Sequence, residues 1–393
     1  MKYFKGFFWL FIELVSVSFF CWMILDEPIV SLYNRFRPLG YETEHLMVAQ
    51  VENYERQASD EEVADRNRQL AERLEQLPEV STVTIMGTSA LLNYYTGRMS
   101  FSVRDTTKEQ LMVSSFDCGP EHFFHTMGFT PAEGTSIESL DAAKEGVVLT
   151  RSLAEYLFGS VHCLGKHTSD GNVVGVIEDV RADLTQPFAD VIFNYTNHAS
   201  YTTNNILIRL KESADPRLFQ KKFEQDYKYQ LKIGPQFIRH INGMNEEGVS
   251  FFRKHTSEQD IPLIGGGIFL LNVLLGTIGT FWIHTRKRMQ EIGVRRAFGA
   301  TKSHIHRMLL GEGFVLTTLS VLLGCLAYFN IAVKNGLSQC TKSPICDLWF
   351  TNFSTHFTVV SILIYLLLLT VVSIGIAIPA WRASRTHIVD TLK

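Results

Sequence analysis

The chain has 393 residues, with 37 Lys and Arg against 40 Asp and Glu, and 46% of its residues are hydrophobic. Charged and apolar residues occupy different stretches: residues 26–260 hold 23 basic and 35 acidic side chains, whereas the remainder holds 14 basic and 5 acidic ones. A polar, acidic domain is therefore joined to a hydrophobic, basic part. This division excludes a purely soluble enzyme, a nucleic-acid binder and a disordered chain.

Four long apolar runs are found outside the polar domain. They are 19, 23, 20 and 24 residues long, and a helix needs about 20 residues to cross a bilayer, so we predict four transmembrane helices. The first run is longer than the roughly 7–15 residues of a signal-peptide core and no Ala-x-Ala site follows it, which favours a retained anchor. The runs are Phe7–Leu25, Ile261–Ile283, Phe314–Val333 and Phe357–Ala380.

Basic residues indicate the orientation of these spans. The connector 284–307 has seven Lys and Arg and a single acid, and both ends of the chain are also basic. Loops rich in Lys and Arg stay on the cytoplasmic side of a membrane. We therefore predict that both termini and the connector are cytoplasmic, whereas residues 26–260 and the loop 334–356 are outside.

The polar domain alternates helical and strand patterns. Glu55–Leu77 has the spacing of an amphipathic helix and Val80–Met86 that of a strand. A strand–helix–strand pattern returns at Asn205–Leu210, Asp215–Leu231 and Gln236–Ile241. These residues predict an α-helical membrane protein with four transmembrane helices and a large α+β extracytoplasmic domain, in which two strand–helix–strand units flank an inserted lobe.

The predicted organisation divides the chain into eight segments. The domains are 1–25 (cytoplasmic N-terminus and first span), 26–260 (extracytoplasmic domain), 261–283 (second span), 284–307 (cytoplasmic connector), 308–333 (third span), 334–356 (outer loop), 357–380 (fourth span) and 381–393 (cytoplasmic tail).

Two polar residues lie inside predicted spans. Glu13 is in the first span, where an acid at the bilayer centre costs at least about 2.5 kcal/mol and usually faces protein. One interpretation is an interhelical hydrogen bond to Asn272 or to a serine of another span. The other is an interfacial residue without a function.

The six cysteines are divided between the spans and the outer segments. Cys340 and Cys346 bracket a proline in the outer loop, and an oxidising compartment permits a disulfide between them, which we predict. No Cys-x-x-Cys or zinc-ligand spacing occurs, so no metal site is predicted. Gly159, Gly165 and Lys166 depart from the spacing of a phosphate-binding loop, and no catalytic residue is predicted.

The connector has the most specific pattern. Arg288, Glu291 and Arg295 fall at i, i+3 and i+7, so on a helix one carboxylate can bridge two guanidinium groups. Gly299 is placed to end that helix in a left-handed turn, and Thr301 can cap the next helix. Ile292, together with Ala297 and Phe298, is expected to provide an apolar contact, so that a short, rigid basic helix lies against the inner face of the membrane. Composition alone favours a loop that only sets topology.

The order of residues in the connector resembles a known family. Glu291–Thr301 (EIGVRRAFGAT) is similar to the cytoplasmic segment of MacB/FtsX-like ABC transporter permeases. Val147–Gly159 and Val173–Asp179 resemble the periplasmic core domain of MacB-like members, and Ile378–Ser384 resembles the family's carboxy-terminal signature. Glu312 matches a glutamate common in the family. The resemblance extends over essentially the whole chain.

The resemblance implies a non-enzymatic permease of the bacterial inner membrane. It implies a homodimer, or a heterodimer with a related permease, and a separate ABC ATPase subunit that binds ATP and Mg, because only Met1–Gly6 precede the first span. This chain is expected to bind no cofactor itself, and a periplasmic adaptor is an expected further partner. The residues implied to couple to the ATPase are Arg288, Glu291, Ile292, Gly293, Arg295, Arg296, Ala297 and Gly299.

Several functions are compatible with this resemblance. The first is the permease of an efflux or extrusion complex, which transmits an ATP-driven conformational change to the periplasmic domain. The alternatives are an FtsX-like signalling permease that activates a periplasmic cell-wall hydrolase, or a lipoprotein-release permease. A membrane-anchored enzyme or sensor is a third class. The outer lobe has no recognisable ligand signature, so the substrate is not predicted.

Overall fold

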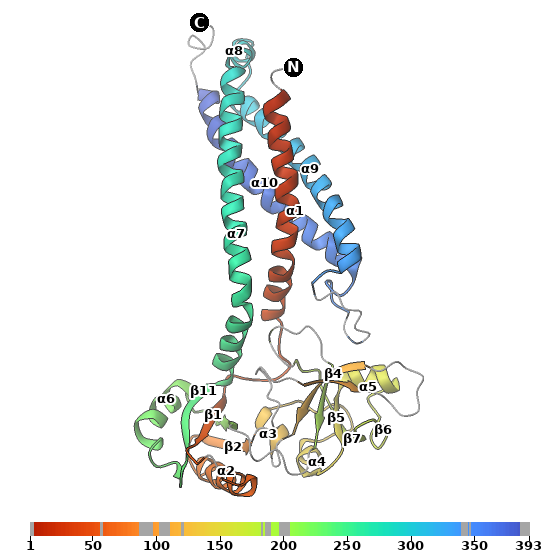
Figure 1. The fold of residues 1–393 in the computed structure, drawn as a ribbon, viewed down its shortest axis with the longest axis vertical. Coiled ribbons are helices and arrows are strands. Elements are labelled where there is room, and N and C mark those ends of the chain that lie inside the picture. The colour runs from red at the N-terminus through yellow and green to blue at the C-terminus, as the bar shows by residue number, and fades with distance from the viewer. Residues whose placement is uncertain are drawn as a thin grey trace. The chain divides into compact units, whose positions relative to one another are not determined.

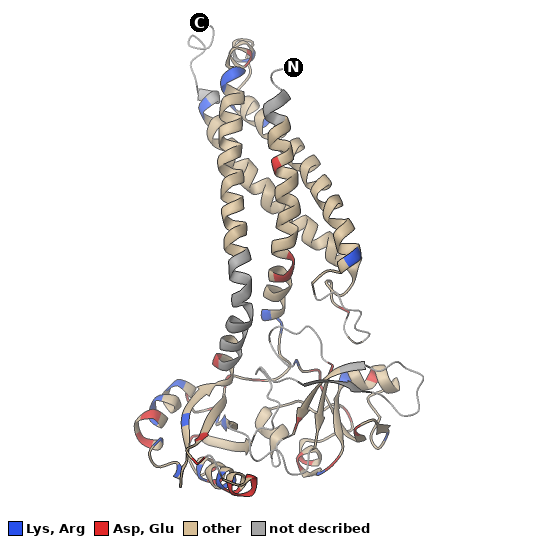
Figure 2. Ribbon diagram, in the orientation of Figure 1, with Lys and Arg blue, Asp and Glu red and all other residues tan. Residues whose placement is uncertain are grey.

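The computed structural model describes residues 4–55, 58–85, 97–101, 111–118, 122–181, 184, 190–195, 205–338, 345 and 347–385 (Figure 1). The chain divides into two compact units. A membrane unit comprises residues 1–32, 256–342 and 348–393, and a polar unit comprises residues 33–255 and 343–347. Figure 2 shows charged residues gathered on the polar unit and around the connector, whereas the long helices carry few of them.

Four helices in the described part of the chain are long and apolar enough to cross a membrane, which confirms the predicted number. Each extends beyond its apolar run, because the run marks the stretch suited to lipid and polar residues on either side continue the helical hydrogen bonds. The helices are α1 (Phe4–Arg35), α7 (Met244–Lys287), α9 (Lys302–Asn335) and α10 (Phe353–Arg385).

Small residues allow these helices to pack closely. A Cβ added at Gly324 of α9 would lie 1.7 Å from the Ser18 hydroxyl of α1, and one at Gly375 of α10 would lie 2.9 Å from Thr277 of α7. Helices in lipid associate through such close contacts because burial from water contributes little there. The glycines therefore set how α1, α7, α9 and α10 pack in the membrane unit.

The first sheet of the polar unit has five antiparallel strands in the order β10-β11-β1-β9-β2. Its core contains Ile206 and Ile208 of strand β9, which lies between β1 and β2, packed with Leu70 and Leu74 of a helix. The elements are β1 (Leu46–Asn53), α2 (Asp60–Glu75), β2 (Val80–Ile85), β9 (Asn205–Leu210), α6 (Pro216–Lys222), β10 (Lys232–Ile233) and β11 (Gln236–Gly243).

Between β2 and β9 the chain forms a separate lobe around a six-stranded sheet of order β3-β4-β8-β5-β7-β6. Parallel pairs β4–β8 and β5–β7 lie in its middle, which confirms an α+β domain with an inserted lobe. Its elements are β3 (Gly97–Phe101), β4 (Leu111–Asp117), α3 (Phe123–Met127), α4 (Ile137–Ala142), β5 (Val147–Thr150), α5 (Arg151–Phe158), β6 (His167–Thr168), β7 (Gly171–Ile177) and β8 (Val191–Asn194).

Two predicted helices differ from the observed ones. Helix α2 begins at Asp60 rather than Glu55, because Ser59 and Glu62 form a reciprocal capping box that defines its start. Helix α6 ends at Lys222 and continues as a π-helical turn, Phe223–Tyr227, instead of running to Leu231.

The two cysteines that the structure describes in the polar unit are not paired with each other. Cys118 and Cys163 are free, buried thiols in two different hydrophobic clusters. The predicted disulfide between Cys340 and Cys346 lies outside the described residues.

Candidate functional site

The connector folds as a short helix, α8 (Met289–Ala297), between α7 and α9. Gly299 ends it with a φ of +94°, a left-handed conformation that favours glycine because L side chains clash there. Thr301 then caps α9, since its hydroxyl accepts a hydrogen bond of 3.2 Å from the His304 amide. Local sequence therefore fixes both the length of α8 and the sharp turn that follows it.

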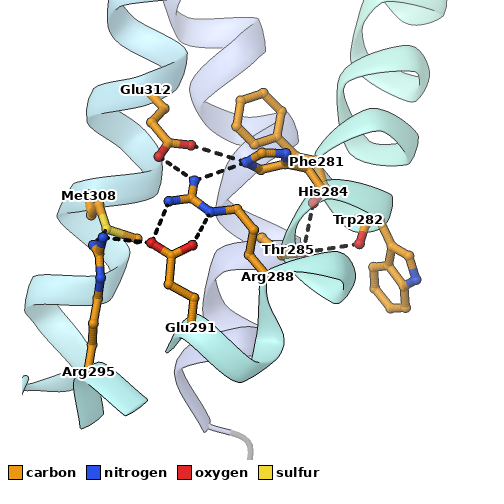
Figure 3. A network of polar contacts seen from close by, with 9 residues as sticks. All are labelled: Phe281, Trp282, His284, Thr285, Arg288, Glu291, Arg295, Met308 and Glu312. Atoms are coloured by element: carbon orange, nitrogen blue, oxygen red, sulfur yellow. Dashed lines mark hydrogen bonds and ion pairs between the residues drawn. The ribbon is translucent and has the colours of Figure 1, made fainter. Parts of the chain in front are cut away.

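A network of ion pairs joins α8 to its neighbouring helices (Figure 3). Arg288, between α7 and α8, donates from Nε to Glu291 Oε2 at 2.8 Å and from Nη2 to Oε1 at 3.1 Å. Arg295 also donates to Glu291 Oε1, at 2.7 Å. The Glu291 carboxylate thus bridges the two guanidinium groups, as the spacing of the three residues in the sequence suggests.

Arg288 also reaches α9. Its Nη1 donates to Glu312 Oε1 at 2.6 Å, and Nη1 lies 3.1 Å from His284 Nε2 of α7. Because arginine cannot accept a hydrogen bond, the His284 ring accepts at Nε2 when its hydrogen is on Nδ1. A single guanidinium therefore contacts side chains from α7, α8 and α9 (Figure 3).

The charges in this network favour its ionised forms. The hydrogen bond from Arg288, followed by the charges of Arg288 and Arg295, holds the pKa of Glu291 below its ordinary value. The same hydrogen bond to Glu291, together with Glu312, raises the pKa of Arg288. The Glu291 side chain is 44% exposed, so solvent screens these contacts and they define geometry more than stability.

The apolar residues of α8 divide between two environments. Ile292 is 1% exposed and belongs to the hydrophobic core of the membrane unit, with Gly293 buried beside it. Phe298, at 89% exposure, and Ala297 are exposed, unlike Ile292. The helical rotation of about 100° per residue cannot place all three on one narrow face. The Arg296 side chain lies outside the described ones.

The polar residues inside the spans are not paired as expected. The Asn272 amide donates to the Ile268 carbonyl of its own helix at 3.1 Å, and its side chain is exposed. Glu13 instead lies against Gly276, where an added Cβ would be 2.9 Å from Oε1. Glycine leaves room for the carboxylate beside α7, so Gly276 is a neighbour of Glu13 on that helix.

Sequence spacing did not reveal the long-range partners of the network. Arg288 and Glu312 are 24 residues apart, beyond the range of helical i, i+3 and i+4 rules. The only signal for Glu312 in the sequence was its position between Gly311 and Gly313, near the start of the third predicted span. Among the residues that the structure describes, no group of three His, Cys, Asp or Glu side chains is placed to hold a metal ion.

Comparisons with known proteins place this geometry in a family. Residues 36–226 match a family model described as the MacB-like periplasmic core domain. Residues 263–388 match one described as the FtsX-like permease C-terminal segment. The second match contains α8, Arg288 and Glu312, so the ionic network lies in the permease segment.

Individual relatives are more distant. A macrolide export ATP-binding/permease protein MacB of Neisseria gonorrhoeae is 24% identical over 304 residues, which cover 72% of this chain and 44% of that protein. A MacB of Bartonella henselae is 25% identical over 334 residues, covering 80% and 46%. The matches thus span less than half the length of these curated relatives.

Two solved structures are similar to part of the chain. The periplasmic region of MacB from Actinobacillus actinomycetemcomitans is 13% identical, covers 54% of this chain and 94% of that one, and has a TM-score of 0.33. The extracellular domain of the noncanonic ABC-type transporter YknZ from Gram-positive bacteria is 13% identical, covers 49% and 100%, and has a TM-score of 0.29. Because a MacB-like periplasmic core domain precedes an FtsX-like permease segment, the chain belongs to the MacB/FtsX-like family of ABC transporter permeases.

Proposed function

We propose that this permease is a subunit of an ABC-type efflux or extrusion complex and transmits an ATP-driven conformational change to its periplasmic domain. ATP and Mg are bound by a separate cytoplasmic ATPase subunit, and two permease chains, identical or related, form the membrane core. The observation that carries the proposal is the network around Arg288, which links α8 to both α7 and α9 and leaves Phe298 exposed.

The contacts of α8 suit it to pass a displacement on to its neighbouring helices. Ile292 anchors one face in the core of the membrane unit, while Arg288 contacts Glu291 and Glu312 on two helices. A displacement of α8 therefore has to move the ends of α7 and α9 as well. Helix α7 is continuous for 44 residues after β11, so it gives such a displacement an unbroken covalent path.

The exposed end of α8 supplies the proposed contact with the ATPase. Phe298 and Val294 are 89% and 44% exposed and lie one helical turn apart. Exposed aromatic side chains flanked by arginine are typical anchors of protein interfaces. In this proposal Phe298 enters a pocket on the ATPase, and Arg295 lies at the rim of the contact.

Affinity purification from mild detergent tests the coupling directly. We expect an ABC ATPase to copurify with the wild-type chain and to be lost with Phe298→Ser, because this exposed side chain contributes little to folding. The matched control is Tyr229→Ser, which removes an aromatic side chain that is 83% exposed in the polar unit. Equal recovery of the ATPase with both variants would contradict the proposal.

The FtsX-like match to residues 263–388 also supports a second function, in which the same movement activates a periplasmic partner without transport. The same purification separates the two. Copurification of a periplasmic adaptor supports extrusion, whereas a peptidoglycan hydrolase supports the signalling function. Capture of a lipoprotein supports lipoprotein release.

A further inference from the structure

A second pair of titratable side chains lies inside the membrane unit, and the coupling network does not use it. Asp26 of α1 and His356 of α10 are 6% and 0% exposed, and His356 Nε2 lies 2.7 Å from Asp26 Oδ1. They come from opposite ends of the sequence. A buried charge is costly unless it is paired and hydrogen-bonded, so the contacts of both groups determine what the pair can do.

Every polar atom of this pair has a partner. His356 Nδ1 lies 2.9 Å from the Phe350 carbonyl oxygen, and Asp26 Oδ2 accepts a hydrogen bond of 2.9 Å from the Ser338 amide. Ser338 follows the end of α9, and Phe350 precedes α10. The pair therefore holds α1, nine residues before its end at Arg35, to the segments that leave α9 and enter α10.

The geometry requires a proton. Both ring nitrogens of His356 face oxygen atoms, and the Phe350 carbonyl can only accept, so Nδ1 must carry a hydrogen. Oδ2 of Asp26 is used as an acceptor by the Ser338 amide. A neutral imidazole has one N–H and cannot serve both contacts, so an ionised Asp26 beside it would place two lone pairs 2.7 Å apart.

We propose that Asp26 and His356 form a proton-binding site, which clasps α1 to the end of α9 and the start of α10 when it is loaded. The bound proton lies on His356 Nε2 or on the Asp26 carboxyl, and either position supplies the missing hydrogen between Nε2 and Oδ1. Loss of the proton turns this contact into a repulsion and releases the clasp. The compartment that these helix ends face can thereby control how tightly the spans are joined.

The surroundings keep the site dry and restrict what else can titrate. The Trp349 and Phe350 rings lie edge-on to the His356 ring, with centroids 5.4 and 6.4 Å away. From α9, Tyr328 is the titratable side chain that interacts electrostatically with Asp26, and its ring stacks on Trp22. Among the residues that the structure describes, the other groups hydrogen-bonded to the pair are the Ser338 amide and the Phe350 carbonyl, which do not titrate.

The isosteric variant Asp26→Asn separates a proton site from a merely structural contact. Its amide nitrogen can donate to Nε2 of a neutral His356, while its oxygen still accepts from Ser338. All hydrogen bonds are then satisfied without an added proton. Asp26→Leu instead removes the hydrogen bonds to His356 and Ser338 at every pH.

The test measures the melting temperature of the purified full-length chain in lipid nanodiscs from about pH 5 to about pH 8, the range in which an imidazole changes charge. We expect the wild type to lose several degrees as pH rises, relative to Asp26→Asn. The melting temperature of Asp26→Leu should be low over the whole pH range. Tyr328→Phe should keep the pH dependence of the wild type.

Three results would overturn the proposal. Parallel profiles of the wild type and Asp26→Asn would show that no proton is bound at the pair. Equal instability of Asp26→Asn and Asp26→Leu would show that the hydrogen bonds described above do not hold the site. A flat profile for Tyr328→Phe would assign the pH dependence to the phenol instead.

Discussion

The membrane unit contains two ionic clusters that differ in almost every physical respect. The network around Arg288 is partly exposed, and its members are joined by several charge-assisted hydrogen bonds. The Asp26–His356 pair is buried among aromatic rings and joined by one contact between the charged groups. Water screens the first cluster and makes each bond weak, whereas its absence makes every bond of the second cluster essential.

This contrast indicates different roles. In a partly exposed network with redundant contacts, the ion pairs can break and re-form as the helix is displaced. This suits a segment that docks onto a moving partner. A buried pair with one bond between its charged groups has two states, joined or broken, and suits a clasp. Measurements of stability and accessibility can test that difference.

The largest effect is expected for His356→Leu. Removing one partner of a buried pair leaves Asp26 unpaired, which costs about 3–5 kcal/mol of unfolding free energy. Thermal unfolding in nanodiscs measures the loss. The matched control is Thr355→Leu, one residue earlier and exposed, which should be close to the wild type. If the two variants have the same melting temperature, the pair does not stabilise the membrane unit.

A smaller effect is expected for Arg288→Leu. The variant leaves the half-buried Glu312 without its guanidinium, at a cost of about 1–3 kcal/mol, while Glu291 keeps Arg295. Adding Glu312→Leu should restore part of the loss, because both polar partners are then removed. ATPase copurification should remain low in both variants. Full recovery of that binding in the double variant would show that the link to α9 is not needed for coupling.

Glu291→Gln is expected to have a weak and pH-dependent effect. Each exposed pair contributes about 0.3–0.5 kcal/mol, and the pKa of Glu291 is lowered in the folded chain from its ordinary value of 4.5. Its contribution is therefore present above pH 4.5 and is lost as pH falls through the lower folded value. The melting temperatures of wild type and variant should therefore converge in acid, and they should also converge in high salt, which screens the ion pairs. A difference that persists in high salt would argue against an electrostatic origin.

The last prediction concerns accessibility and requires no change in stability. In a background without the native cysteines, Tyr229→Cys should react with an impermeant maleimide when only the outer membrane is permeabilised, and Gln290→Cys should not. Both positions are exposed, so burial cannot explain the difference. The physical reason is the excess of basic residues in the connector. Reversed labelling would invert the proposed topology and remove the ATPase from the side of α8.

Short-range patterns in the sequence determined much of this protein. The apolar runs predicted four spans, because a bilayer requires a fixed length of uncharged helix. The spacing of Arg288, Glu291 and Arg295 led us to expect the bridging carboxylate, since residues three and four apart meet on any helix. Gly299 and Thr301 marked a turn and a cap for the same local reason.

Tertiary structure decided the contacts between distant segments. Glu312 joins Arg288 across 24 residues, and Asp26 meets His356 across 330, so no periodicity connects either pair. The expected role of Asn272 failed because its amide bonds its own helix, while the space at Gly276 receives Glu13. Which side chains meet between helices depends on how the helices rotate and approach, and that is set by all their packing contacts together rather than by any one spacing.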